Sequence, residues 1–172
     1  MKTFKVEGVV LKRKSLGEAD RIITVFTRKY GKMKILAKGV RRIKSRRGPN
    51  VELFNQVNLV IHNGRTFDLL SEAEVVNTFS QIRKNLDLVG LGFHVCEIVD
   101  GLCPEHQPYP RVYDLLIKLL NELDQGLIHN FEKNLLEELG YLPREHKEVD
   151  TTSYIENILE RRLKARRVLG RF

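Results

Sequence analysis

The 172-residue chain has no tryptophan and only two cysteines, and aromatic residues make up 8% of it. Cys96 and Cys103 are too few for a disulfide framework, and their apolar context fits a reducing compartment. No apolar run approaches the roughly 20 residues of a membrane span. The N-terminus carries charges where a signal peptide has its apolar region. We therefore expect a soluble cytoplasmic protein with no membrane partner.

Motifs of common enzymes are also missing. The sequence has no Gly-x-x-x-x-Gly-Lys phosphate loop, no Gly-x-Ser-x-Gly turn and no His-Glu-x-x-His pair. Glu18 and Asp20 lie among basic residues and suggest nuclease carboxylates, but two acids at this spacing are more typical of turns and ion pairs. The sequence predicts a binding protein, not an enzyme, and no cofactor.

One group of residues has metal-ligand chemistry, namely His94, Cys96, Cys103 and His106. These residues straddle the end of a predicted helix, and they lack the paired Cys-x-x-Cys spacing of structural zinc sites. We expect buried thiols and surface histidines here, with no metal.

Positive charge is abundant and unevenly distributed. Residues 1–50 contain 16 lysines or arginines and three acids, a net charge of +13, whereas the whole chain has +8. Residues 51–150 are acidic, and residues 151–172 are again basic. Such a dense cationic segment indicates a polyanionic partner, and nucleic acid is the leading candidate. A merely solvated basic surface is the alternative.

Apolar and charged residues alternate with period two through the first half of the chain, as strands with one buried face do. Asn63-Gly64 is a strong signal for a type I′ hairpin turn. Five antiparallel strands in about 75 residues suit a small closed barrel better than a sandwich, which usually needs about seven. The predicted strands cover residues 4–12, 21–27, 32–38, 51–61 and 66–75.

The apolar period changes from two to 3.6 near residue 78, which predicts an α+β protein with a barrel domain at 1–78 and an all-helical domain at 79–172. Thr78 and Ser153 each open a capping-box pattern, Pro110 suits a first helical turn and Gly126 suits a helix end. The predicted helices cover residues 78–101, 110–126, 127–139 and 153–163.

The basic residues of strand 32–38 and of the segment that follows it form the predicted nucleic-acid surface. If Met33, Ile35 and Ala37 face the barrel interior, Lys32, Lys34 and Lys38 lie on the outer face. The spacing of roughly 7 Å at each two-residue step matches successive phosphates. Residues 39–50 have little apolar content, so we expect a loop that is mobile until an anion orders it. The predicted contacts are Lys32, Lys34, Lys38, Arg41, Arg42, Lys44, Arg46 and Arg47, with Arg13, Lys14, Arg21 and Arg65 as further candidates.

Few aromatic side chains are available to stack on bases. Tyr30 and Phe67 are candidates, whereas Phe26 is a better candidate for the core. We therefore expect binding dominated by the nucleic-acid backbone and tolerant of sequence. An RNA-binding or ribosome-associated barrel protein is the alternative to a DNA-binding one.

Several motifs, taken in order, resemble the bacterial DNA repair protein RecO family. They include Gly8-Val-Val-Leu, the stretch from Leu16 to Thr27, Tyr30-Gly-Lys32, and Ala37-Lys-Gly-Val-Arg-Arg42 with Ser45. Downstream, Phe131-Glu132, Leu135-Leu-Glu-Glu-Leu-Gly-Tyr-Leu-Pro143 and the basic segment Arg162-Leu-Lys-Ala-Arg166 continue the likeness.

The resemblance implies an N-terminal OB-fold and a C-terminal helical domain. It also implies binding of single- and double-stranded DNA, annealing of complementary strands, and loading of RecA recombinase onto strands coated by single-stranded DNA-binding protein. The implied protein partners are RecR, in some bacteria RecF, and the acidic C-terminal tail of the single-stranded DNA-binding protein, with RecA engaged indirectly. Members of the family are mediators, not enzymes.

Two departures from the family pattern concern zinc and the partner site. Many members carry a four-cysteine zinc module after the Leu-Gly-Tyr-Pro stretch, but here only residues 144–150 separate Pro143 from the last predicted helix. The position before Phe131-Glu132, often arginine in the family, is His129-Asn130. The residues that this resemblance offers for partner binding are Arg111, Lys118, His129, Phe131, Arg161 and Arg162.

Overall fold

The computed structural model describes residues 2–165, which divide into two compact units. The barrel unit comprises the chain up to Thr78 together with Pro104–Pro110. The helical unit comprises Phe79–Cys103 and the chain from Arg111 onward. The segment Pro104–Pro110, here called the strap, thus belongs to the barrel, which a single boundary near residue 78 does not include.

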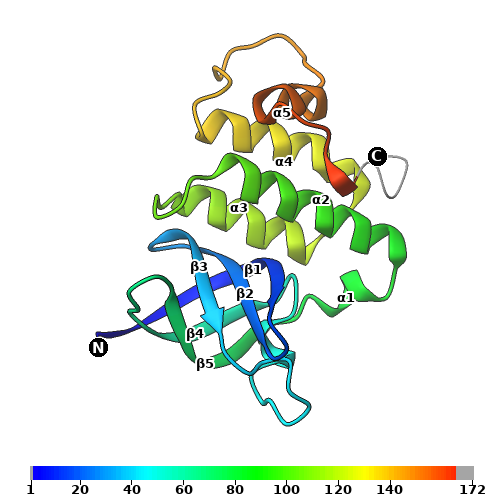
Figure 1. Ribbon diagram of the computed structural model, residues 1–172. Helices are drawn as coiled ribbons and strands as arrows, with labels where there is room; N and C mark the ends of the chain where they lie inside the picture. Colours follow the sequence, from blue (N-terminus) through cyan, green and yellow to red (C-terminus); the bar gives the residue numbers. More distant parts are fainter. Residues whose placement is uncertain (1, 166–172) are drawn as a thin grey trace. The chain divides into compact units, whose positions relative to one another are not determined.

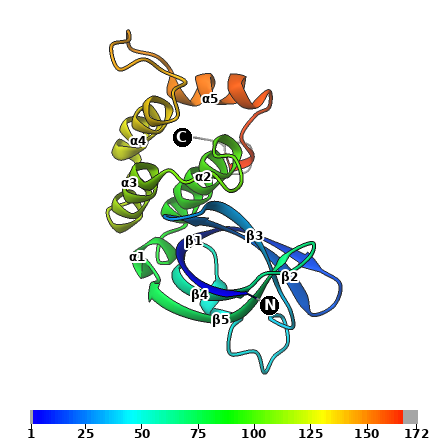
Figure 2. The same cartoon turned by 90° about the vertical axis from the view of Figure 1, so that its left-hand side faces the viewer.

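Five strands close into a barrel in the order β1-β2-β3-β5-β4 (Figure 2). Consecutive strands alternate in direction, and a ring with an odd number of strands must then contain one parallel pair. That pair is β3 with β5, and the other four pairings are antiparallel. The predicted five-stranded barrel is confirmed, with this one parallel pairing added. The strands are β1 (Thr3–Leu16), β2 (Asp20–Thr27), β3 (Gly31–Ala37), β4 (Gln56–His62) and β5 (Asp68–Asn77).

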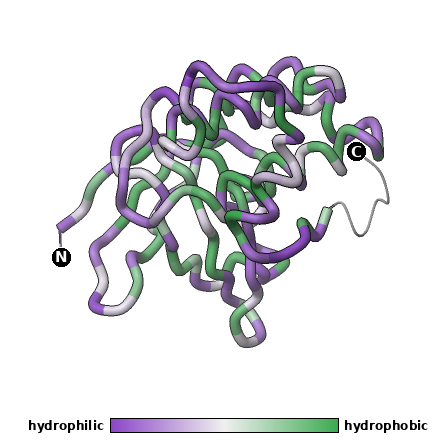
Figure 3. Tube along the Cα trace, turned by 90° about the horizontal axis from the view of Figure 1, so that it is seen from above, coloured by the Kyte–Doolittle hydropathy of each residue, from purple (hydrophilic) through white to green (hydrophobic). Residues whose placement is uncertain are grey.

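Inward-facing aliphatic residues fill the barrel. Met33, Ile35 and Ala37 are all buried in this core, as the period-two pattern of β3 predicts. Figure 3 shows hydrophilic and hydrophobic stretches alternating along the trace. Because strand side chains point alternately to the two faces, each strand contributes one row to the core and one to the surface.

The first strand is long and passes between two neighbours. Gly8 pairs with Thr27 on β2 and with Val57 on β4. A Cβ at Gly8 would lie 2.5 Å from Val25 Cγ1, so only glycine fits this close approach. A register shift between Val10 and Lys12 bends the same strand, as β-bulges do at barrel corners.

Two sequence predictions about the β4 region are wrong. The fourth strand begins at Gln56, and a 3₁₀ turn, η1 (Pro49–Val51), replaces the start of the predicted strand. The type I′ turn is absent, because neither Asn63 nor Gly64 has a positive φ. The connection between β4 and β5 spans residues 63–67, which is too long for a two-residue hairpin turn.

The helical unit contains five helices among the described residues (Figure 1). Helices α2, α4 and α5 contact one another. Fully buried leucines and isoleucines, such as Ile98, Leu116 and Leu135, form its core. The helices are α1 (Ser80–Arg83), α2 (Leu86–Leu102), α3 (Pro110–Asn121), α4 (Gln125–Glu138) and α5 (Thr151–Leu159).

Short polar side chains place the helix starts differently from the predictions. Asn85 caps α2 by accepting from the N–H groups of Asp87 and Leu88, so the predicted helix 78–101 is split into α1 and α2. Asp124 and Asp150 cap α4 and α5. The predicted capping box at Ser153 and the predicted stop at Gly126 are therefore wrong, since Gly126 lies inside the first turn of α4.

The last predicted helix is also shorter than the sequence indicates. Helix α5 ends at Leu159, where Glu160 takes a left-handed conformation with φ 55°. Leu163 is nevertheless fully buried, so its apolar periodicity reports burial and not helix continuation. Among residues 2–165, no helix is both long and apolar enough to cross a bilayer.

Candidate nucleic-acid interface

A hollow of about 710 Å³ opens between the start of β2 and the segment that follows β3. Five of its lining residues are cationic and only Asp20 is anionic. Such a concave cluster of cations focuses positive potential, which attracts phosphate groups. We call it the cationic hollow, and its lining residues are Asp20, Lys38, Gly39, Arg42, Lys44, Ser45, Arg46 and Arg47.

The lone acid of the hollow is structural. The Asp20 carboxylate accepts a hydrogen bond from the Gly39 N–H at 2.7 Å. Gly39 has φ +68°, a conformation that glycine adopts without strain. The Arg41 N–H donates to the Ala19 carbonyl at 3.0 Å, so the β1–β2 turn and the segment after β3 are joined directly. This geometry favours the turn role over the nuclease role for Asp20.

Arg47 fastens the far side of the same segment. Its guanidinium donates to the Leu70 carbonyl at 2.8 Å and to the Lys38 carbonyl at 2.8 Å. The Asn50 side chain donates to the Ala73 carbonyl at 2.9 Å. Residues 39–50 therefore have more fixed contacts than their composition indicates, and they form an anchored loop, here called the basic loop.

The strap changes the environment of two predicted contacts on β3. Lys32 is 9% exposed, so it does not belong to an open outer face as predicted. Its backbone carbonyl accepts from the His106 N–H at 2.9 Å, and Lys34 forms an ion pair with Glu105 at 2.5 Å. The ammonium of Lys34 beside Glu105 holds the pKa of that carboxyl below its ordinary value. Alternation correctly assigned these lysines to the non-core face, but it gave no sign that another segment covers that face.

The remaining predicted cations are spread over the barrel unit. Arg13 is paired with Glu52 at 2.7 Å, and Arg41 donates to the Gly17 carbonyl at 2.9 Å beside the hollow. Lys14 and Arg65 are exposed and Arg21 is half-buried, and none of the three lines the hollow. The structure thus brings together Lys38, Arg42, Lys44, Arg46 and Arg47, which were predicted, with Ser45 and Gly39, which were not predicted as site residues.

The aromatic candidates are mostly engaged elsewhere. Phe26 is fully buried, as expected for a core residue. Tyr30 packs edge-to-face on Phe4, with ring centroids 5.5 Å apart, and Lys29 lies over its ring. Phe67 is half-buried. Ile43, within the basic loop, is an exposed apolar residue that the sequence pattern did not indicate.

A buried polar network lies within the helical unit. His94 of α2 and Glu132 of α4 form a hydrogen bond of 2.6 Å with both side chains almost fully buried. The Glu132 carboxylate also accepts from the hydroxyls of Thr151 and Thr152 at the start of α5. His129, a predicted partner residue, lies 3.1 Å from the Thr151 hydroxyl. This network links three helices, so its primary role is structural.

Two other predicted partner residues are also committed to the fold. Phe131 is 4% exposed and packs in the core. Arg161 forms an ion pair with Glu97 at 2.6 Å, while Arg162 is exposed. Burial tends to raise the pKa of Glu97, but hydrogen bonds from the Lys164 N–H, Arg161 and the Ala165 N–H lower it overall. The family-like basic position 166 lies outside the described residues.

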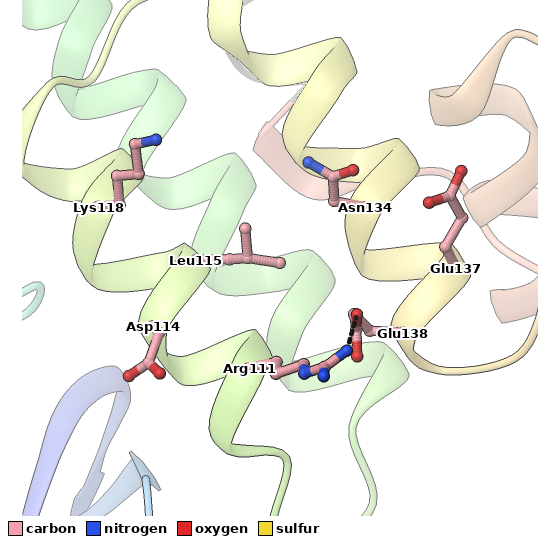
Figure 4. Close-up of a pocket in the computed structure, with 7 residues that line it drawn as sticks. All are labelled: Arg111, Asp114, Leu115, Lys118, Asn134, Glu137 and Glu138. Carbon is pink, nitrogen blue, oxygen red and sulfur yellow. Dashed lines mark ion pairs between the residues drawn. The ribbon is translucent and has the colours of Figure 1, made fainter. Parts of the chain in front are cut away.

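A groove of about 440 Å³ between α3 and α4 contains the last two predicted partner residues, Arg111 and Lys118 (Figure 4). Leu115 lies between them on the same helix. Arg111 and Glu138 form a weak ion pair at 3.6 Å. The groove mixes both signs of charge, and its other lining residues are Asp114, Asn134 and Glu137.

The four residues with metal-ligand chemistry do not converge. His94 is engaged with Glu132, and His106 is in the strap. Cys96 and Cys103 are buried, and burial, with a contribution from Asp100, raises the pKa of the Cys96 thiol to about 12. Within residues 2–165, no group of three or more His, Cys, Asp or Glu side chains could hold a metal ion.

The fold and the hollow together define a class: a small closed barrel of OB type carrying a cationic surface, followed by a helical region. Comparison with protein families gives the same division. Residues 1–79 match the model described as "Recombination protein O N terminal", and residues 83–158 match "Recombination protein O C terminal". The chain therefore belongs to the RecO family of DNA repair proteins.

Curated relatives agree with this family. The chain is 32% identical over 144 residues to the DNA repair protein RecO of Listeria monocytogenes, a match covering 81% of this chain and 56% of the relative. It is 34% identical to that of Pelotomaculum thermopropionicum, covering 83% and 57%, and 38% identical to that of Bifidobacterium longum, covering 84% and 64%. The chain thus spans little more than half the length of the first two of these relatives.

Proposed function

We propose that this protein binds single- and double-stranded DNA through the cationic hollow, anneals complementary strands, and helps to load RecA recombinase onto coated single strands. The observation that carries the proposal is the convergence of Lys38, Arg42, Lys44 and Arg46 on one concave surface of an OB-type barrel. A surface that neutralises phosphates on two strands at once reduces the repulsion that opposes their encounter. Membership in a family of DNA repair proteins favours DNA over the RNA-binding alternative.

The test is fluorescence-monitored annealing of two complementary DNA strands, bare and pre-coated with single-stranded DNA-binding protein. We expect acceleration on both substrates. The variant Arg42→Ala/Lys44→Ala/Arg46→Ala should lose it, because three phosphate contacts disappear while Arg47, which fastens the loop, remains. The matched control Lys84→Ala/Arg144→Ala/Lys147→Ala removes the same charge from exposed sites of the helical unit and should anneal normally.

Unchanged annealing by the basic-loop variant would contradict the assignment to the hollow. Equal loss in the control would attribute the effect to net charge. Acceleration on bare strands alone would retain DNA binding and contradict mediator activity, and a preference for folded RNA without annealing would select the RNA-binding alternative.

For the protein partner, we propose that the acidic tail of the single-stranded DNA-binding protein docks in the α3–α4 groove. Arg111 and Lys118 supply cations there, and Leu115 offers an apolar surface between them. Glu138 competes for Arg111, so Glu138→Gln should tighten tail binding and Arg111→Ala should weaken it. Fluorescence anisotropy of a labelled tail peptide measures both, and equal affinity for both variants would contradict this docking site. RecR and, in some bacteria, RecF remain the proposed partners in loading, with RecA engaged indirectly.

A further inference from the structure

Ile43 stands out among the apolar side chains because its relative exposure is 104%. Single exposed aliphatic residues are ordinary on protein surfaces, so exposure by itself carries no function. Its placement is less ordinary. The neighbours on both sides, Arg42 and Lys44, line the cationic hollow, whereas Ile43 does not line it.

Hydrogen bonds within the basic loop constrain the backbone on both sides of Ile43. The Arg42 N–H donates to the Gly39 carbonyl at 3.1 Å, and the Ser45 N–H donates to the Arg42 carbonyl at 2.9 Å. Ile43 therefore lies in the second of two consecutive turns, 39–42 and 42–45, and hydrogen bonds of Gly39 to Asp20 and of Arg47 to Leu70 fasten the loop to the barrel. An anchored loop presents its apolar residue at a smaller entropic cost than a free one.

A second partly exposed aliphatic side chain lies next to a turn that is hydrogen-bonded to the basic loop. Leu16, at the end of β1, is 42% exposed. The next residue, Gly17, accepts a hydrogen bond from the Arg41 guanidinium at 2.9 Å, which joins the β1–β2 turn to the basic loop. The region beside the hollow thus combines cations for phosphates with aliphatic groups for apolar surfaces.

We propose that Ile43 is a wedge that inserts between adjacent bases of DNA whose phosphates occupy the cationic hollow. This inference rests on the proposed DNA-binding function. Charge complementarity selects the occupant: the cations on either side of Ile43 recruit a polyanion, and the apolar surface that such a polyanion offers next to its phosphates is a base step. Aliphatic side chains at this kind of position partly unstack the step into which they insert. An unstacked step on a bound strand presents its bases for pairing with a second strand.

The test uses the full chain and a DNA duplex containing 2-aminopurine, whose fluorescence rises when its stacking is lost. At saturating protein we expect a rise with the wild type and a signal close to that of free DNA with Ile43→Ala. The affinity of Ile43→Ala should fall only about fivefold, and its slope of log affinity against log salt should not change, because no phosphate contact is lost. Ile43→Leu should retain most of the signal.

Val76→Ala is the matched control, since Val76 is 48% exposed on β5 and lies outside the basic loop. It should behave as the wild type. An undiminished signal with Ile43→Ala, or no signal from saturated wild-type complexes, would overturn the wedge and leave DNA binding intact. Absence of salt-dependent binding by the wild type would instead overturn the proposed function itself.

Discussion

At the scale of single residues, Gly8 is a position where neighbouring strands leave no room for a side chain. An added Cβ would lie 2.5 Å from Val25 Cγ1 and 2.8 Å from the Phe26 carbonyl oxygen. We expect Gly8→Ala to lower the free energy of unfolding by roughly 1–3 kcal/mol, because the strands must move apart to accept one methyl group. Urea unfolding followed by circular dichroism measures this change.

The companion variant Gly8→Ala/Val25→Ala tests whether the contact with Val25 causes the loss of stability expected for Gly8→Ala. Removing the Val25 methyl groups relieves one of the two close contacts, while the contact with the Phe26 carbonyl remains. The double variant should therefore be more stable than the sum of the two single effects implies. Simple additivity would show that this close contact is not the cause.

Two adjacent arginines of the basic loop should differ in their contribution to stability. Arg47 donates to the Leu70 and Lys38 carbonyls, whereas Arg46 is exposed and lines the hollow. We expect Arg47→Ala to lower the free energy of unfolding by roughly 1–3 kcal/mol, and Arg46→Ala to change it by less than about 0.5 kcal/mol. Both should weaken DNA binding. Thermal unfolding and DNA anisotropy on the same samples distinguish them, and identical stability of the two variants would contradict the structural role of Arg47.

The sequence could predict that both arginines are in a basic segment, but not which of them is structural. A charge pattern contains no information about carbonyl groups 23 residues away, such as that of Leu70. Asp20 was uncertain for the same reason, because its partner, the Gly39 N–H, is distant in sequence. A local sequence pattern predicts the charge and hydrogen-bonding groups at a position. Hydrogen bonds to residues distant in sequence decide whether those groups stabilise the fold or remain available to a ligand.

At the scale of elements, the strap covers a part of β3 that was predicted to contact DNA. The Glu105 carboxylate forms an ion pair of 2.5 Å with the Lys34 ammonium. A DNA phosphate could take the place of that carboxylate. We expect Glu105→Gln to tighten DNA binding and to make the salt slope steeper by about 0.7 on a single strand, because one more phosphate can be neutralised. Salt titrations by anisotropy measure the slope.

Glu72→Gln is the matched control for this variant. Glu72 is an exposed acid of β5, so its replacement changes net charge equally. It should leave the slope unchanged. Equal slopes for Glu105→Gln and the wild type would show that Lys34 does not reach DNA even when released.

Strands were more predictable than their connections. Alternation located β2 and β3 closely because each presents one face to the core. The same pattern failed between Val51 and Gln56, where Val51 ends a 3₁₀ turn and the buried Phe54 and Asn55 follow outside any strand. The apolar period continues across Asn85, whose side chain caps α2, so the sequence pattern does not reveal the split between α1 and α2. The period of apolar residues indicates which residues face the core. It does not indicate a short break between two helices.

At the scale of the whole molecule, acid should destabilise both units. The pKa of Glu97 in the helical unit and that of Glu105 in the barrel unit are below the ordinary value of 4.5. A carboxyl with a depressed folded pKa contributes stability that is complete above its unfolded pKa and is lost as the pH falls through the folded value. We expect the unfolding free energy to be level above about pH 5.5 and to decline progressively below it.

Denaturant unfolding from pH 7 down to pH 3 checks this expectation. Glu97→Gln/Glu105→Gln should be less stable at neutral pH and should show a shallower decline in acid, because two of the responsible carboxyls are gone. A decline of equal steepness in the variant and the wild type would assign acid sensitivity to other groups.

The strap makes the barrel unit discontinuous along the chain. Its residues, Pro104–Pro110, follow 25 residues of the helical unit, and the Gln107 backbone lies so near Gly31 that an added Cβ would be 2.1 Å from its carbonyl oxygen. During synthesis on a ribosome, all five strands therefore emerge before the segment that covers β3. The nascent barrel passes through a stage in which Lys34 lacks Glu105 and the backbone of Lys32 lacks His106, and the order of translation exposes this edge of β3 until the start of α3 has been made.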